Sequence, residues 1–240
     1  NEGKLLLATL LYCYRHYRMV RDITLLILSE KDLKEKKEFI FLKCLSLSWI
    51  SILYQSRFDY IRAYIEGSKA IRIYSDDPRF HNMFGTIIRR GISLNLEKKK
   101  TLDDAIQIYQ NALDRCTIKD NMLKAAIKSN IAYSIVLKVD HTMEELNYAN
   151  ELIKEMEKLW SRDNWIIDFW SIEGFVQFNI AELTDDPSEK KIYLKKAHEK
   201  LIRARNLGEK YKIATFMMNK IQRRLENVER RLEKLKYFST

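Results

Sequence analysis

Three pairs of adjacent aspartates have the composition of an acid/base or metal site: Asp76-Asp77, Asp103-Asp104 and Asp185-Asp186. Neighbouring carboxylates can share a proton or hold a divalent cation. Each pair, however, stands at the start of a predicted helix, where the helix dipole favours acidic side chains. We therefore interpret the pairs as parts of helix starts and expect no metal site.

The cysteines and histidines form no catalytic or metal-binding pattern. They are Cys13, Cys44 and Cys116, and His16, His81, His141 and His198. An odd number of widely spaced cysteines without C-x-x-C indicates reduced thiols in a cytoplasmic protein. No histidine follows a glutamate by three residues, as in di-iron helices, and H-E-x-x-H, G-x-x-x-x-G-K-[ST] and G-x-G-x-x-G are absent. We expect a protein that is not an enzyme and needs no cofactor.

An aromatic cluster at Trp160, Trp165 and Trp170 is a candidate platform for stacking nucleic-acid bases. Such a platform needs basic residues between the aromatic ones. Arg162 lies in the cluster but is followed by Asp163. We therefore favour a buried joint between two helices and keep base stacking as the alternative.

Composition predicts an all-α fold. Six glycines and two prolines among 240 residues are too few for the turns of a β-sandwich or a doubly wound sheet. The 46% apolar fraction can supply a sizeable core, and no apolar run approaches the roughly 18 residues of a membrane span. Lys and Arg outnumber Asp and Glu by 43 to 33, a net charge of +10, which favours an acidic partner.

Capping signals mark where the helices begin. A hydroxyl residue precedes an acidic one by three positions, as in a capping box, in four places: Ser29/Asp32, Ser56/Asp59, Thr101/Asp104 and Thr142/Glu145. Only the last has the longer Glu, so we expect the strongest box there. Both prolines follow an aspartate, at Asp77-Pro78 and Asp186-Pro187, and are predicted at the first position of a helix.

Two series of these helix starts repeat with one period. The first is Ser56, Thr101, Thr142 and Asp186, separated by 45, 41 and 44 residues; the second is Asp77, Asp120 and Arg162-Asp163, separated by 43 and about 42. Two interleaved series indicate a two-helix unit of about 43 residues. Because such a unit buries its apolar face only against its neighbours, the sequence predicts a helical solenoid.

Small and large residues recur inside these units. The second helices contain Ala105-x3-Tyr109-x2-Ala112, Ala197-x3-Leu201-x2-Ala204 and Ala149-x3-Ile153-x2-Met156, and the first helices contain Phe84-Gly85, Ile131-Ala132 and Glu173-Gly174. Over residues 40–208 this pattern resembles the tetratricopeptide-repeat family, in particular its long-unit relatives in the sensor arms of bacterial regulators and large signalling ATPases. The resemblance implies a right-handed superhelix of antiparallel helix hairpins.

In that family the first helices line a concave face that holds a peptide or a partner helix. With Gly85, Ala132 and Gly174 as anchors, the resemblance implies these contact residues: Asn82, Thr86, Arg89 and Arg90; Ser129, Asn130 and Tyr133; Ser171, Phe175, Phe178 and Asn179. Asn amides can pair with a peptide backbone, Arg can bind carboxylates, and aromatic rings supply contact area. The alternative is that the aromatic residues belong to the core and the asparagines to the solvated surface.

The net charge resides in residues 189–236, which contain 16 Lys and Arg against 6 Glu. Apolar residues spaced alternately by four and three predict one long helix from about Lys210 to Lys236: Ala214, Met218, Ile221, Leu225, Val228, Leu232 and Leu235. Such a seam either caps the solenoid or forms half of a homodimeric coiled coil. The basic side chains that could bind nucleic-acid phosphates are Lys195, Arg203, Arg223, Arg224, Arg230 and Arg231.

We therefore expect a repeat domain over residues 1–208, with hairpins at about 4–54, 56–96, 101–138, 142–183 and, in part, 186–208. A basic C-terminal helix follows over residues 209–240. The predicted function is a non-catalytic protein- or peptide-binding scaffold, the sensor or interaction arm of a larger regulatory protein. Nucleic-acid binding through the C-terminal segment is the alternative.

Overall fold

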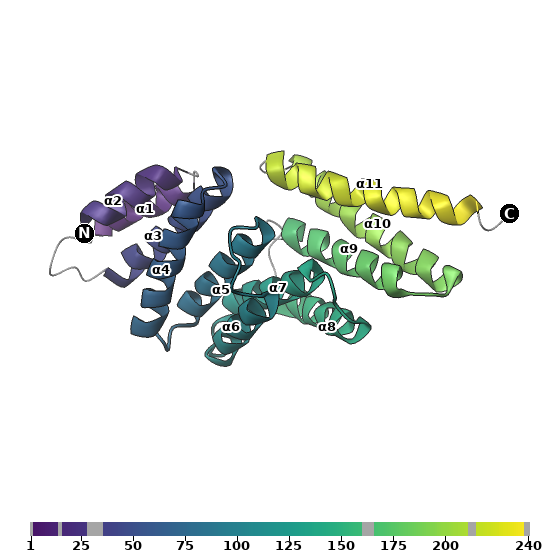
Figure 1. Ribbon diagram of the computed structural model, residues 1–240, viewed down its shortest axis with the longest axis horizontal. Coiled ribbons are helices and arrows are strands. Elements are labelled where there is room, and N and C mark those ends of the chain that lie inside the picture. The colour runs from purple at the N-terminus through teal and green to yellow at the C-terminus, as the bar shows by residue number, and fades with distance from the viewer. Residues whose placement is uncertain (1, 14–15, 28–35, 160–165, 211–214, 238–240) are drawn as a thin grey trace. The chain divides into compact units, whose positions relative to one another are not determined.

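A computed structural model describes residues 2–13, 16–27, 36–159, 166–210 and 215–237, and every regular element in these ranges is an α-helix. The helices fall into two compact units, residues 1–119 and 120–240 (Figure 1). Within each unit, every helix packs against the next one along the chain. The all-α class is thus confirmed. None of the described helices has both the length and the apolar content that crossing a membrane requires.

The first unit is built from α1 to α6. Their bounds are α1 Glu2–Cys13, α2 Tyr17–Ile27, α3 Lys36–Leu53, α4 Arg57–Ile73, α5 Pro78–Ser93 and α6 Leu102–Asp114. Residues 4–54 hold three helices where one hairpin was expected. The division between α1 and α2 was missed because residues 4–54 contain no glycine or proline to signal it.

The second unit is built from α7 to α11. Their bounds are α7 Asn121–Leu137, α8 Met143–Leu159, α9 Ile166–Leu183, α10 Pro187–Lys210 and α11 Thr215–Tyr237. The expected hairpin at 101–138 is divided, because the boundary between the units falls between Lys119 and Asp120. The C-terminal helix is described from Thr215, and Ala214 and the predicted start of that helix lie outside the described residues or next to them.

Side chains cap the helices at most of the expected starts. Ser56 Oγ accepts a hydrogen bond from Asp59 N, and Asp77 accepts one from Arg79 N. Reciprocal capping boxes close at Thr142/Glu145 and also at Thr101/Asp104, where Thr101 N lies 2.8 Å from Asp104 Oδ2. The shorter Asp is therefore long enough, contrary to expectation. The starts at Ser29 and at Arg162-Asp163 lie outside the described residues.

The repeat period is confirmed by the helix starts. The even-numbered helices α4, α6, α8 and α10 begin at Arg57, Leu102, Met143 and Pro187, which are 45, 41 and 44 residues apart. Among the odd-numbered helices, α5 and α7 begin at Pro78 and Asn121, which are 43 residues apart, whereas α3 and α9 directly follow residues that the structure does not describe. One structural unit of about 43 residues thus recurs through both halves of the chain.

The apolar seam of α11 packs inside the second unit. Leu225 and Val228 are fully buried in a cluster with Ala181 of α9 and with Leu194 and Leu201 of α10. Ile221 is buried beside Ala204 in a neighbouring cluster. The seam therefore packs against the last hairpin, α9 and α10, as expected of a capping helix.

Candidate partner-binding face

The odd-numbered helices form the inner layer of each unit. In the first unit α1 contacts α3, and α3 contacts α5; in the second unit α7 contacts α9, and α9 contacts α11. Among the described helices, the backbones of α2 and α4, of α4 and α6, and of α8 and α10 do not come into contact. A stack whose helices touch in one layer and spread apart in the other curves toward the first, and such curvature produces concave binding surfaces. The odd-numbered helices are therefore the candidate partner-binding face.

A close contact joins the two layers within a hairpin. A β-carbon on Gly85 of α5 would lie 2.8 Å from the Tyr109 ring of α6, too close for any side chain. The Tyr109 hydroxyl donates to Thr86 Oγ1 at 3.0 Å. Arg89 Nε in turn donates to the Tyr109 oxygen at 3.3 Å. Since Arg89 is only 8% exposed, it belongs to this joint, which corrects its expected place on an open groove.

Arg90, the next predicted contact residue, joins α5 to α3. Its guanidinium carbon lies 4.1 Å above the ring of Trp49, and its Nη1 lies 3.2 Å from Ser48 Oγ. Trp49 stacks on Tyr17 and donates from Nε1 to Tyr12 Oη at 2.9 Å. Four helices thus meet around one arginine and three aromatic rings.

Burial shapes the electrostatics of this aromatic joint. Desolvation, together with the neighbouring Arg89, lowers the pKa of Arg90 to about 10. The guanidinium nevertheless remains charged at neutral pH, because that value is still well above 7. The ring of Trp49 offers it a favourable face, since cations are attracted to the electron-rich surface of aromatic rings.

In the second unit, α11 engages the predicted face of α7 and α9. Arg224 donates from Nη1 to Ser171 Oγ at 2.9 Å and to Ser171 O at 3.2 Å. Its guanidinium carbon lies 4.1 Å from the ring centre of Phe175, and Lys220 Nζ lies 4.2 Å from that of Tyr133. Tyr133 and Phe175 are therefore half-buried beneath two cations, neither core nor open groove.

Arg224 does not suit the role of a phosphate ligand that the sequence suggested. It is 9% exposed, and its donors point to Ser171 inside the unit. A guanidinium held in this way cannot reach a nucleic-acid backbone. The sequence missed this because the basic residues of the segment all look alike without knowledge of which face α11 buries.

The remaining predicted face residues are half-buried and lie on inner-layer helices. Asn179 Nδ2 donates to Phe175 O on its own helix at 2.7 Å. Phe178 packs at the edge of the cluster around Ala181. Asn82 on α5, with Ser129 and Asn130 on α7, are also half-buried. Ser129 lies one turn before Tyr133 and so shares the face that α11 reaches.

The other basic candidates are exposed on α10 and α11. They are Lys195, Arg203, Arg223, Arg230 and Arg231. Arg203 pairs with Glu199 at 2.8 Å, and Arg231 pairs with Glu182 of α9 at 2.6 Å. Exposed pairs of this kind contribute little stability, so they do not prevent these side chains from binding an anion.

One described tryptophan of the aromatic cluster lies among cations. Trp170 packs edge-on against Phe169, and its ring centre lies 4.2 Å from Lys200 Nζ. Arg203 approaches the same ring at 5.3 Å. These cations come from α10, about thirty residues along the chain, so the local sequence did not show them. Trp160 and Trp165 lie outside the described residues.

The acidic pairs serve as helix caps. Asp77 forms ion pairs with Lys37 at 2.6 Å and with Arg79 at 2.8 Å. Burial alone would raise the pKa of Asp77, but the hydrogen bonds from Arg79 and Lys37 outweigh it and hold the pKa at about 2. Asp186 accepts from Ser188 N and Glu189 N at the start of α10. Over the ranges that the structure describes, no three His, Cys, Asp or Glu side chains gather as a metal site would require.

Sequence reasoning missed the aromatic joint of the first unit. Trp49 lies in α3, where the stretch Leu45–Ile52 alternates serine with apolar residues and shows no helical face. Tyr12 and Tyr17 fall in the segment whose division into two helices was missed. The available signal was the tryptophan itself, since tryptophan is enriched at binding hot spots.

Comparisons with protein-family models, with curated proteins and with solved structures find no match to this chain.

Proposed function

We propose that this chain is a non-catalytic protein- or peptide-binding scaffold, with hairpins wound as a right-handed, tetratricopeptide-like superhelix. It would serve as the sensor or interaction arm of a larger regulatory protein in the cytoplasm. The observation that carries the proposal is the inner layer of contacting odd-numbered helices in each unit. Layers of this kind present extended concave surfaces to partner chains.

The side chains on that layer are of the types that dominate binding interfaces. In the first unit, Trp49 on α3 and Arg90 on α5 stack on one another. Tyr133 is held beneath Lys220 in the second. Rigid aromatic and arginine residues lose little conformational entropy when a partner binds, which favours affinity.

The two glycine contacts support the repeat reading. Gly85 meets Tyr109 between α5 and α6, and Gly174 meets Leu201 between α9 and α10. In each case the small residue of a first helix lies against the large residue of the Ala-x3-large-x2-Ala pattern. Two hairpins in different units thus share one packing rule, as expected of a repeat family.

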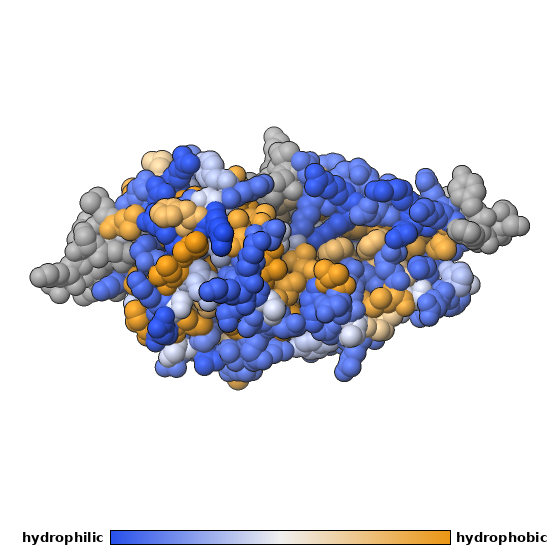
Figure 2. Space-filling view, in the orientation of Figure 1, coloured by the Kyte–Doolittle hydropathy of each residue, from blue (hydrophilic) through white to orange (hydrophobic). Residues whose placement is uncertain are grey.

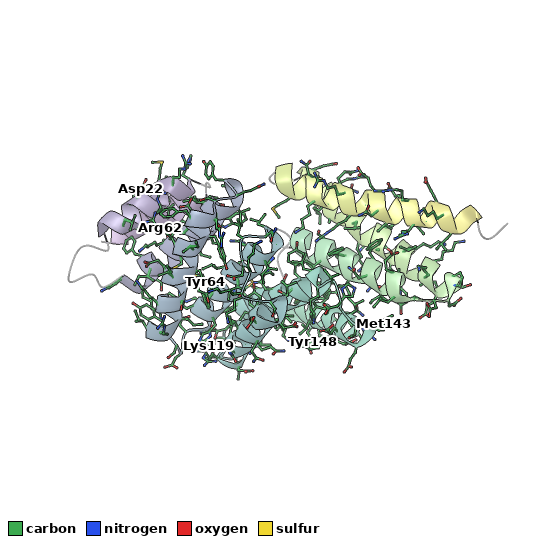
Figure 3. All side chains as sticks on the ribbon, in the orientation of Figure 1. Asp22, Arg62, Tyr64, Lys119, Met143 and Tyr148 are labelled. Carbon is green, nitrogen blue, oxygen red and sulfur yellow. The ribbon has the colours of Figure 1, made fainter. Side chains whose placement is uncertain are left out.

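A pull-down with matched variants tests the proposal. Ser129→Arg adds bulk to the inner layer at a half-buried position, while Tyr148→Arg makes a similar change on the even-numbered helix α8, where Tyr148 is 43% exposed (Figure 3). We expect a partner protein, quantified by mass spectrometry, to be lost with Ser129→Arg and retained with Tyr148→Arg at equal melting temperatures. Equal recovery of the partner protein with both variants would show that the inner layer does not bind it.

Nucleic-acid binding is the second candidate, favoured by the net charge of +10 that resides in residues 189–236. Lys195, Arg203, Arg223 and Arg230 are exposed there. Filter binding with RNA and DNA should then show retention at low salt that falls steeply as salt rises. Arg223→Glu combined with Arg230→Glu should abolish retention, whereas Lys99→Glu in the first unit should not. No retention at low salt would exclude this function.

A further inference from the structure

The helix α4 carries an exposed apolar stripe. Tyr54, just before the helix, is 55% exposed, Phe58 is 69% exposed, and Ile61 and Ile65 are each 45% exposed. The spacings of three and four residues place Phe58, Ile61 and Ile65 on one face of the helix, and Tyr54 lies in the turn that precedes it. Large apolar side chains exposed in a row are uncommon on soluble domains and mark interaction sites.

The stripe lies on the side of α4 that faces away from its neighbours. Tyr60, Ala63, Gly67 and Ala70 are the buried residues of α4, and they form its opposite side. The helix contacts α3 and α5, but its backbone does not contact those of α2 and α6. Hydrophobic side chains are visible on the surface of the first unit over the region where α4 lies (Figures 1 and 2).

Basic side chains flank the stripe. They are Arg57, Arg62, Lys69 and Arg72, all on α4, and Arg18 of α2. The Arg62 guanidinium lies 5.6 Å from the ring centre of Phe58, and that of Arg18 lies 4.1 Å from the ring centre of Tyr54. The N-terminal end of the stripe is therefore covered in part by two cations.

The acidic residues of α4 lie away from the stripe and face cations. Glu66 pairs with Lys43 of α3 at 2.9 Å. Asp59 is half-buried and close enough to Arg21 of α2 to raise the pKa of that guanidinium. The open face of α4 is thus apolar at its centre and positive at its edges.

We propose that this face docks an amphipathic helix of a partner protein, with an apolar stripe flanked by Asp and Glu. On α4 the stripe runs from residue 58 to residue 65, about 10 Å or two helical turns. It is about one side chain wide, which suits the groove between the side-chain ridges of a facing helix. A second copy of α4 would bring like charges together, and a membrane surface would engage a wider apolar face.

Fluorescence anisotropy with two synthetic peptides tests this docking. One probe is an amphipathic helix of about 18 residues with a leucine stripe flanked by glutamates; the other has lysines in place of the glutamates. We expect saturable binding of the acidic probe, weaker by about tenfold or more for the lysine probe and for the Phe58→Ala/Ile65→Ala variant. Ile192→Ala on α10, where Ile192 is 52% exposed, is the matched control and should leave binding unchanged.

Three results would overturn the proposal: no saturable binding of the acidic probe, equal binding of both probes, or equal binding to the Phe58→Ala/Ile65→Ala variant. Two further experiments measure binding to anionic vesicles and, by light scattering, dimerisation of the protein. Vesicle binding or dimerisation that this variant abolishes would assign the face to a membrane or to a second copy instead. Because Ser129 and the inner layer are untouched, failure here leaves the proposed scaffold function standing.

Discussion

Gly85 of α5 lies against the ring of Tyr109 of α6 so closely that a β-carbon on the glycine would be 2.8 Å from Tyr109 Cε1. Gly174 of α9 has the same relation to Leu201 of α10, where the corresponding distance is 2.7 Å. These two contacts occupy equivalent places in two hairpins. They set the distance between the two helices of each hairpin, α5 and α6 in one case and α9 and α10 in the other.

Replacing Gly85 with Ala should lower the free energy of unfolding by about 1–3 kcal/mol, because the buried Tyr109 ring cannot move aside without disturbing the core. In an unconstrained helix the same change would be stabilising by about 0.5–1 kcal/mol. Urea unfolding measures the difference. Tyr109→Leu should offset part of the loss in the double variant, and a stabilised Gly85→Ala would contradict the contact.

Asp77→Asn should reveal the contribution of the carboxylate charge. The folded-state pKa of Asp77, about 2, is below its ordinary value near 3.8. A depressed pKa stabilises the fold above the ordinary value, and that stabilisation is lost as pH falls from there through about 2. Asparagine keeps the capping oxygen but removes the charge and one acceptor of the hydrogen bonds from Lys37 and Arg79.

We expect Asp77→Asn to unfold at lower urea than wild type at pH 7, and the two proteins to converge between about pH 4 and pH 2. Asp140→Asn, at an exposed position between α7 and α8, is the control and should show no such convergence. If the difference in urea midpoint between wild type and Asp77→Asn stays constant from pH 7 to pH 2, the ion pairs of Asp77 with Lys37 and Arg79 do not stabilise the fold.

Arg224→Ala should loosen α11 from the second unit. The change removes hydrogen bonds to Ser171 and the contact with Phe175, with an expected loss of about 2–3 kcal/mol. Arg223→Ala, the exposed neighbour, should stay within about 0.5 kcal/mol of wild type. Hydrogen exchange of the α11 amides should rise only in Arg224→Ala. Equal effects of both variants would mean that Arg224 is a surface residue.

Cys44 should resist alkylation in the folded protein. Burial raises the pKa of its thiol to about 12, so almost no thiolate exists at pH 8, and the side chain is fully buried. Cys116 is half-buried and should react with iodoacetamide before Cys44 does. Site-resolved mass spectrometry, with urea-unfolded protein as the positive control, measures both rates. Rapid labelling of Cys44 in native buffer would contradict the packing of α3.

The sequence could predict the repeat because helix starts are local. Ser56, Thr101, Thr142 and Asp186 each cap the helix that follows within three residues, so their spacing reports the period directly. The division of residues 4–54 could not be predicted in this way. No glycine or proline marks it.

The candidate site was harder to predict because its contacts are distant in sequence. Arg90 and Trp49 are 41 residues apart, and Arg224 and Ser171 are 53 residues apart. Identifying which side of a helix faces its partner needs the partner in place. The family resemblance located Arg90 and Phe175 on inner helices, but it could not show that other side chains already cover them.

Site-specific photo-crosslinking tests the central claim most directly. Benzoylphenylalanine placed at Ser129 reports on the inner layer, and the same group at Tyr148 of α8 reports on the outer one. In cells that produce the protein, irradiation should join a partner protein to position 129 and not to position 148. Crosslinking of that protein from position 148 alone, or of no protein from position 129, would contradict the account.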